Sequence, residues 1–349
     1  MVTQKDIAQR LGVSASLVSR VLAGSAEKIG ASRETIRRIR EEAARMDYRP
    51  SAAALSLRGA TSQTIGVIAK DFEDPFFGRM IGELQSLAVE KDYSLIPSGC
   101  FPLSPQSDLN SLVRYRVDGI AILGSDFPPE WLKPFSRAEI PVVQIGSGPA
   151  PTEITRVMMD DELGIEQLIG LLLKLGHRDI GYIGNNTAAH IRREQALRAA
   201  LRRHGLVDRP NAFAVVSVVD FQTGFLAINQ LLEQCADLTP TAVIAADDVT
   251  AQGALRALFE KKIEVPREMS IAGIDDIPSA RLTIPALTTL RQPIREMVRE
   301  AFNYLTDESA RTKPRGSKIT VDPELVVRES CGGPCASSIR KFLSTGGRW

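Results

Sequence analysis

Short and hydrogen-bonding side chains gather in the stretch SASLVSRVL, residues 14–22. Ala15 and Ser16 are small enough to let another surface approach closely. Ser19 can donate and accept a hydrogen bond, and Arg20 can pair with a guanine edge or hold a phosphate. Side chains of these types near the start of one helix suit the major groove of double-stranded DNA. The stretch therefore predicts direct reading of DNA bases.

The segments around this stretch predict a turn between two short helices. Thr3-Gln4-Lys5-Asp6 is a capping-box pattern that opens a first helix, and Gly12 can take the left-handed conformation that ends it. Ser14 can then cap the second helix, whose apolar side is Val18, Val21 and Leu22. We also place the two cap residues, Thr3 and Ser14, among the predicted DNA contacts.

A third helix is predicted from Ser32 onward. Its apolar positions, Ile36, Ile39, Ala43 and Met46, are spaced by three and four residues and so share one face. Three helices around one small core give a helix-turn-helix DNA-binding headpiece over residues 1–49. The alternative for this region is a small helical bundle with a glycine turn and no DNA-binding role.

The charge of the chain is distributed unevenly. The whole sequence has a net charge of +1, but residues 1–60 carry 11 lysines and arginines against 6 acidic residues, a net +5. The remainder therefore has a net charge of −4. A basic headpiece on a mildly acidic body fits a polyanionic partner for the headpiece alone, although charged helix faces are common on any surface.

A short linker, residues 50–62, follows the headpiece. Pro50 ends the third helix, Ser51 can cap a new one, and Gly59 can close it after AAALSLR. Two helical turns are only marginally stable alone in water, because helix nucleation is costly. We expect this hinge helix to fold only when another molecule stabilises it.

From residue 63 to 330 the pattern changes to short apolar strands that alternate with amphipathic helices. One series runs through TIGVIA, SLIPSG, GIAILG and PVVQIG, and a second through RVMMD, DIGYIG, FAVVSVV, TAVIAA and MSIAGID. Buried strands that alternate with helices indicate parallel sheets covered on both faces. We predict an α/β core of two doubly wound subdomains with a ligand cleft at the carboxyl ends of the strands. Residues 331–349 are predicted to be a flexible tail.

Other function classes find little support in the sequence. Four cysteines in 349 residues do not form a disulfide framework. Cys331 and Cys335 lie far from the three histidines, so we expect no metal and no cofactor. No GxGxxG, P-loop or nucleophile elbow stands in a strand-turn-helix context, which argues against an enzyme. Without a signal peptide or a membrane span, the expected location is the cytoplasm.

These motifs, in this order, resemble the lactose/galactose repressor (LacI/GalR) family of bacterial transcriptional regulators. The headpiece resemblance lies in DIA, GVS, VSRVL, TIRRI, Tyr48-Arg-Pro and ALSLRG. In the body, DPFF (74–77) is similar to the family's Asn-Pro-Phe-Phe and LGHRDIGYIG (175–184) to its Leu-Gly-His signature. ADDVTAQGAL, MSIAGIDD and IPALTTLRQP also match, so the resemblance covers nearly the whole chain.

The resemblance implies a homodimeric repressor that binds a palindromic operator and responds to a small-molecule, sugar-like effector. Its core is expected to be periplasmic-binding-protein-like. Matching the hinge residue by residue makes Leu57 the apolar wedge between central base pairs, with Ala54 beside it. A wedge of this kind partly unstacks a base step and bends the duplex.

The resemblance also implies where the effector lies. Asp275 matches an aspartate that accepts hydroxyl groups, and Arg193 an arginine that reaches the effector, with Arg192 as the other possible register. The remaining predicted contacts are Phe76, Phe77, Phe221 and Asp247. A carboxylate facing an arginine between aromatic walls suits a polyhydroxylated ligand, whose hydroxyl groups both donate and accept hydrogen bonds.

The sequence departs from the family pattern at several of these positions. Asp247 replaces an asparagine of many sugar-binding members, Gly146 stands where an acidic residue is frequent, and shortening before Gly224 weakens the match of Phe221. These changes argue against a simple pyranose effector. Alternatives left open are control by a corepressor or a protein partner and, with less support, a sugar-binding transport protein.

Overall fold

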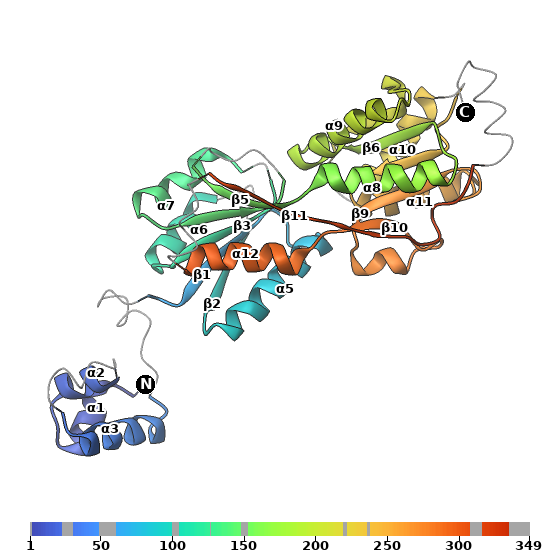
Figure 1. Ribbon diagram of the computed structural model, residues 1–349. Helices are drawn as coiled ribbons and strands as arrows, with labels where there is room; N and C mark the ends of the chain where they lie inside the picture. Colours follow the sequence, from blue (N-terminus) through green and yellow to red (C-terminus); the bar gives the residue numbers. More distant parts are fainter. Residues whose placement is uncertain are drawn as a thin grey trace. The chain divides into compact units, whose positions relative to one another are not determined.

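The structure, a computed structural model, describes residues 2–22, 31–48, 61–99, 105–125, 127–147, 153–218, 222–235, 238–307 and 316–334. Contacts divide the chain into two compact units, Met1–Ser62 and Gln63–Trp349. The described residues of the first unit form three helices, coloured blue in Figure 1: α1 (Gln4–Leu11), α2 (Ala15–Leu22) and α3 (Arg33–Arg45). We describe each unit by itself.

The helix boundaries of the headpiece follow from local capping. Thr3 accepts a hydrogen bond from the Asp6 amide, and the Asp6 carboxylate accepts one from the Thr3 amide, at 2.8 Å. Gly12 ends α1 at φ 66°, and Ser14 caps α2 by accepting from the Leu17 amide at 3.1 Å. The predicted capping box, the glycine stop and the Ser14 cap are all confirmed.

One small hydrophobic core holds the three helices together. Each helix contributes fully buried side chains, and a ring of partly buried residues, including Leu11, Leu22, Ile36 and Met46, packs around them. The buried members are Ile7, Ala8, Val18, Val21, Ile39 and Ala43. Because the apolar residues recur at helical spacing, one face of each helix meets the same core. The predicted apolar positions of the second and third helices are confirmed.

The core contains two six-stranded sheets. The first has the strand order β11-β5-β4-β3-β1-β2, and every pair in it is parallel. Its strands are β1 (Thr64–Ala69), β2 (Ser94–Gly99), β3 (Gly119–Leu123), β4 (Val142–Ile145), β5 (Thr155–Met159) and β11 (Lys318–Val321). The helices of this subdomain are α5 (Pro75–Glu90), α6 (Pro105–Arg114), α7 (Lys133–Arg137) and α12 (Ile294–Thr306), with a 3-10 turn at Pro129–Leu132.

Alternating side chains of the first sheet pack on both of its faces. Ile65 and Val67 of β1 join a cluster with the apolar sides of α5 and α12, whereas Ile68 joins a cluster with α6 and α7. Successive strand residues point to opposite faces, so a strand covered on both sides is apolar at every position. This is why TIGVIA reads as a continuous apolar run, and its six residues are all buried.

The second sheet has the order β12-β10-β9-β8-β6-β7, parallel except for the pair of β10 with β12. Its strands are β6 (Ile180–Asn185), β7 (Phe213–Val216), β8 (Ala242–Ala245), β9 (Ser270–Asp275), β10 (Thr288–Arg291) and β12 (Glu324–Val326). Its helices are α8 (Asp161–Lys174), α9 (Ala188–Arg203), α10 (Thr223–Gln234) and α11 (Asp248–Glu260), with 3-10 turns at Pro210–Ala212 and Pro278–Arg281. The predicted fold class, two doubly wound subdomains after a helical headpiece, is confirmed.

The chain passes between the two subdomains three times, which corrects the two-series prediction (Figure 1). The segment RVMMD was assigned to the second series, but β5 pairs with β4 in the first sheet. After β10 the chain returns to form α12 and β11, and then crosses again to β12. Sequence periodicity identifies a buried strand but not the neighbour that it pairs with, and so the assignment failed.

The start of the predicted flexible tail, residues 331–334, belongs to the core instead. The Gly332 amide donates to Ser270 Oγ at 3.0 Å, and His177 Nε2 lies 2.6 Å from the Gly332 carbonyl oxygen. Burial raises the pKa of the Cys331 thiol to about 11. Buried polar partners that lie far away in sequence hold this segment in place. Residues 335–349, including Cys335, lie outside the described residues.

Candidate functional site

The exposed side of α2 contains most of the predicted base-reading residues. Ser16 and Arg20 are exposed, and Ala15 is half-buried. The two cap residues, Thr3 and Ser14, are also exposed. Side chains one helical turn apart share a face, so Ser16 and Arg20 (four residues apart) present a hydroxyl and a guanidinium to the same side. This side of α2 is the candidate nucleic-acid interface.

Ser19 does not belong to that exposed side. Its side chain is buried, with 8% of its surface exposed, and Val18 and Val21 beside it are core residues. Ser19 precedes Leu22 by three residues on α2, and so it lies at the edge of the same core. The prediction that Ser19 points outward is wrong in this structure, because the apolar side of α2 is wider than Val18, Val21 and Leu22 alone imply.

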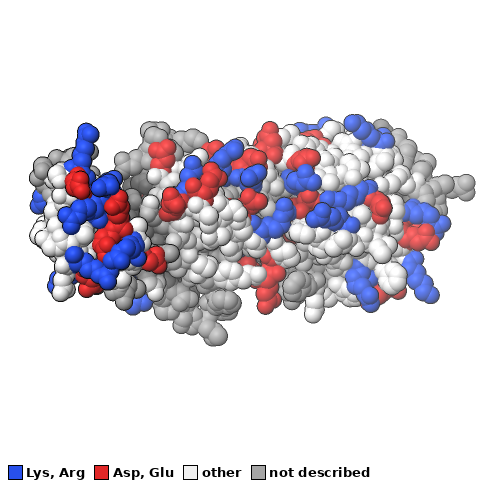
Figure 2. Space-filling model, turned by 90° about the horizontal axis from the view of Figure 1, so that it is seen from below, with Lys and Arg blue, Asp and Glu red and all other residues white. Residues whose placement is uncertain are grey.

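Charged side chains surround the headpiece helices. Figure 2 shows lysines and arginines on the visible face of the headpiece, at the left, with acidic side chains among them. Ion pairs on α3 join Arg45 to Glu42 at 2.8 Å and Arg37 to Glu41 at 3.7 Å. The hinge prediction, with Ala54 and Leu57, lies outside the described residues.

A cavity of about 130 Å³ lies in the core at the carboxyl ends of strands from both sheets. The residues that line it end or directly follow β1, β3, β4, β6, β8, β9 and β10, or lie in the first turns of the helices after them. The lining comprises Lys70, Asp71, Asp74, Phe76, Phe77, Gly124, Ser125, Gly146, Ser147, Asn185, Thr187, Ala189, His190, Arg193, Asp247, Asp275 and Gln292. Parallel strands bring these loops to one edge, where α/β proteins bind ligands.

Of the two neighbouring arginines, Arg193 is in the cavity lining. It is 5% exposed, its Nη1 donates to the Ala246 carbonyl oxygen at 2.5 Å, and its Nη2 lies 3.6 Å from Asp275 Oδ1. Arg192 is not part of this lining, although it contacts the same Asp161 as Arg193, at 3.0 Å. Burial works against the charge of Arg193, but Asp275 and Asp161 outweigh it and raise its pKa.

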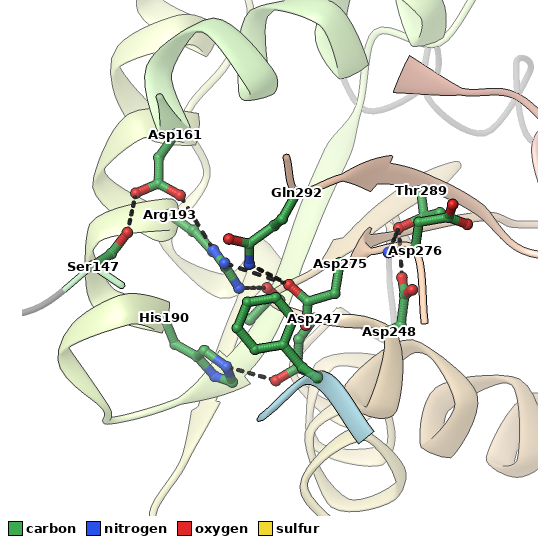
Figure 3. Close-up of polar contacts among 12 residues, drawn as sticks. Ser147, Asp161, His190, Arg193, Asp247, Asp248, Asp275, Asp276, Thr289 and Gln292 are labelled. Atoms are coloured by element: carbon green, nitrogen blue, oxygen red, sulfur yellow. Dashed lines mark hydrogen bonds and ion pairs between the residues drawn. The ribbon is translucent and has the colours of Figure 1, made fainter. Parts of the chain in front are cut away.

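Asp275 ends β9 in a backbone conformation that is rare for a residue with a side chain, at φ 125°. Its carboxylate accepts a hydrogen bond from Gln292 Nε2 at 2.6 Å and faces Arg193 (Figure 3). Burial raises the pKa of Asp275 well above its ordinary value, although Arg193 opposes the shift. Both of these contacts use Oδ1, and Asp275 is part of the cavity lining, where its carboxyl group can meet a hydroxyl group of a ligand.

Asp247 and His190 form a second polar pair in the lining. His190 Nε2 lies 2.8 Å from Asp247 Oδ2, and Asp247 also caps α11 by accepting from the Thr250 amide at 2.6 Å. Burial would raise the pKa of Asp247, but the His190 charge and these hydrogen bonds outweigh it and hold the pKa below the usual range. Asp247 is therefore an ionised carboxylate of the lining, with His190 as its partner.

The start of α5 supplies the aromatic part of the lining. Asp74 caps the helix by accepting from the Phe76 amide at 2.8 Å. The rings of Phe76 and Phe77 meet edge to face with centroids 5.6 Å apart. A short cap followed by proline and two aromatic residues thus brings both rings to the cavity, as the sequence predicts. Of the other predicted effector contacts, only Phe221 lies outside the described residues.

Several lining or supporting residues were missed by sequence reasoning. His190 precedes Arg193 by three residues on α9, so helical spacing alone places it on the same face. Asp161 follows β5 at the carboxyl end of a strand, and it accepts from Ser147 Oγ at 2.8 Å and from Arg193 at 3.4 Å (Figure 3). Gln292 begins the second passage between subdomains and carries no motif that identifies it.

Two absences can be stated for the described part of the chain. No helix in it combines the length and the apolar character required to cross a membrane. No group of three or more histidine, cysteine, aspartate or glutamate side chains in the same residues is arranged to hold a metal ion.

The fold and the cavity are those of a periplasmic-binding-protein-like ligand-binding core that follows a DNA-binding headpiece. The family described as "periplasmic binding protein-like domain" matches residues 169–331. The chain is 31% identical to the HTH-type transcriptional repressor PurR of Erwinia tasmaniensis over 338 residues, which cover 95% of this chain and 97% of that protein. PurR of Salmonella newport matches with the same identity and coverage.

Solved structures share the fold over nearly the whole chain. A lac repressor dimer bound to operator and the anti-inducer ONPF has a TM-score of 0.80 at 22% identity, covering 95% of this chain and 99% of that one. The regulator CelR in complex with cellobiose has a TM-score of 0.67 at 24% identity, covering 95% of this chain and 100% of that one. The chain belongs to the LacI/GalR family and is a DNA-binding transcriptional repressor of that family.

Proposed function

We propose that this repressor binds a palindromic operator as a homodimer in the cytoplasm and that a small polyhydroxylated molecule in the core cavity controls it. The recognition helix is α2, with Ser16 and Arg20 toward the base edges and Thr3, Ser14 and Ala15 close to the DNA. Two headpieces related by twofold symmetry then read two half-sites, which makes the operator palindromic.

One observation carries the effector part of this proposal. The buried guanidinium of Arg193 lies between Asp275 and Asp161, at the edge where strands of both sheets end. Burial of a charged group costs free energy, so charged groups that line a cavity are typical of a functional site. Recognition of a ligand with several hydroxyl groups fits this site, because such groups both donate and accept hydrogen bonds.

An exposed apolar loop supports the proposed dimer. After the 3-10 turn at Pro278–Arg281, Leu282 and Ile284 are 76% and 96% exposed. Gln252 of α11 donates to Ser279 Oγ at 2.7 Å and so joins the outer side of that helix to the loop. Large apolar side chains exposed together are typical of a contact surface. This loop is our candidate for a contact between the two copies.

Control of DNA binding follows from the position of the cavity. Its lining comes from both subdomains, so a ligand that contacts both favours one relative orientation of them. The shift in population equals the difference in ligand affinity between the two orientations, and the coupling to operator binding is reciprocal. A corepressor and an inducer differ only in which orientation they favour. Control by a protein partner remains the alternative.

The test is a metabolite panel screened by thermal shift, followed by operator binding with each hit. A true effector stabilises the wild type, changes operator affinity, and loses both effects in Asp275→Asn. Glu130→Gln, an exposed acidic position outside the cavity lining, is the control that keeps both. A hit that stabilises Asp275→Asn as strongly as the wild type would show that the effector binds elsewhere.

A further inference from the structure

Two carboxylates from opposite subdomains face the same cavity. Asp74 caps α5 beside the first sheet, and Asp247 caps α11 beside the second. Both carboxylates belong to the lining of one cavity of about 130 Å³. The resemblance described above implies asparagine at both positions, and this chain has aspartate at both.

The exchange changes which ligand groups fit. An asparagine amide both donates and accepts hydrogen bonds, whereas an ionised carboxylate only accepts. The ligand group that lies between Asp74 and Asp247 must therefore be a donor. A positively charged donor gains most, because charge-assisted hydrogen bonds are the strong ones.

The cationic groups of the lining do not cancel this preference. Arg193 contacts Asp275 and Asp161, and His190 contacts Asp247, whereas Asp74 accepts from the Phe76 amide and is bonded to no cationic side chain among the described residues. The charges of Asp247 and Asp71 disfavour the ionised form of Asp74, and that of His190 favours it. Lys70 adds one positive charge to the lining, against the carboxyl groups of Asp71, Asp74 and Asp247 in the same lining.

We infer that the effector is a polyhydroxylated molecule that carries an amino group, and that its ammonium binds between Asp74 and Asp247. This inference rests on the proposed function, since it concerns the ligand of the same cavity. The rings of Phe76 and Phe77 lie in the same lining and favour a cation at their faces. Phosphorylated and other anionic ligands are disfavoured by the same carboxylates.

The inference gives the binding a characteristic pH dependence. Burial, with the charges of Asp247 and Asp71, raises the pKa of Asp74 to about 6. An ammonium beside Asp74 favours the ionised carboxyl and lowers this pKa, so binding releases a proton. Affinity for an amine-bearing ligand therefore rises as the pH increases from 5 to 7.5. A neutral ligand that accepts from protonated Asp74 shows the opposite trend.

The experiment uses the full chain and three matched hexose series measured by calorimetry. Each series contains the neutral sugar, the 2-amino sugar and the 6-phosphate: glucose, galactose and mannose with their derivatives. The variants are Asp74→Asn and Asp247→Asn, which keep both helix caps because asparagine caps as well as aspartate. Glu73→Gln removes an exposed charge next to Asp74 and is the matched control.

The expected result is that, in at least one series, the amino sugar binds the wild type about tenfold or more tightly than the neutral sugar at pH 7.5. Asp74→Asn and Asp247→Asn each remove most of that difference, and Glu73→Gln keeps it. If no amino sugar exceeds its neutral partner, or if a phosphate binds best, the inference is overturned. A neutral sugar that binds and shifts operator affinity would leave the proposed function intact while it refutes the amine.

Discussion

The substitution Ile39→Ala should unfold the headpiece and leave the core folded. Ile39 is fully buried at the centre of the small cluster that holds α1, α2 and α3 together. Truncation of a buried isoleucine to alanine costs about 2–5 kcal/mol. A single core in a unit of this size rarely supplies more than about 3–5 kcal/mol. The loss is therefore comparable with the total, and the folded fraction of the headpiece falls to about half or less.

Three readouts report this outcome. Operator affinity falls at least in proportion to the folded fraction, since only a folded headpiece binds. Amide hydrogen exchange of residues 2–48 becomes fast, while the thermal unfolding transition of the core does not move. Glu41→Ala, which removes only an exposed ion pair on the same helix, is the control and changes each readout little. An unchanged operator affinity in Ile39→Ala, or a lowered core transition, would refute the two-unit account.

Three further predictions concern the core. Burial lowers the pKa of His177 to about 4, so the folded state favours the neutral imidazole. Its contribution, roughly 3 kcal/mol, is complete above pH 6.5 and is lost as the pH falls toward 4. The stability difference between the wild type and His177→Gln should therefore shrink over this range; a difference independent of pH would contradict the buried neutral imidazole. Gly224→Ala places a methyl group 1.8 Å from the Thr250 carbonyl oxygen and should cost about 1–3 kcal/mol in chemical denaturation. Gly170→Ala has open space and should be neutral or stabilising, and equal effects would refute the close contact of α10 with α11. Ile284→Asp should weaken the dimer in sedimentation, whereas the exposed control Val207→Asp should not; an undisturbed dimer would place the contact elsewhere.

Much of the fold could be predicted because its local signals agree. Thr3, Gly12 and Ser32 mark helix ends by capping chemistry, which depends on a few neighbouring residues only. Strands buried on both faces read as apolar runs, so most strand positions were also accessible from the sequence. These features need no knowledge of distant contacts, and the structure contains them where they were predicted.

The failures have a common physical cause, which is pairing over long distances in sequence. β5 belongs to the first sheet because of its contact with β4 and β11, and no local pattern encodes that choice. The burial of Ser19 depends on how closely α2 packs in the headpiece. Residues 331–334 are held by Ser270 and His177, which precede them by about 60 and 155 residues.

The candidate site shows the same division. Phe76, Phe77, Arg193, Asp247 and Asp275 were predicted from motifs, and the structure brings all five to one cavity. The partners that set their charges were not predicted: Gln292 on Asp275, His190 on Asp247, and Asp161 on Arg193. A motif identifies the residue that meets a ligand, whereas its supporting contacts come from elements that the fold alone brings together.

The central claim is that α2 of a dimeric repressor reads a palindromic operator. Selection of bound sequences from random double-stranded DNA with the full chain tests it most directly, at a stated salt concentration. We predict enrichment of one palindrome. In Arg20→Ala, the binding free energy that distinguishes the preferred base at one position of each half-site should fall by about 1–3 kcal/mol, while the affinity for arbitrary DNA is mostly kept. Enrichment of no sequence, or of a sequence without twofold symmetry, would contradict the claim.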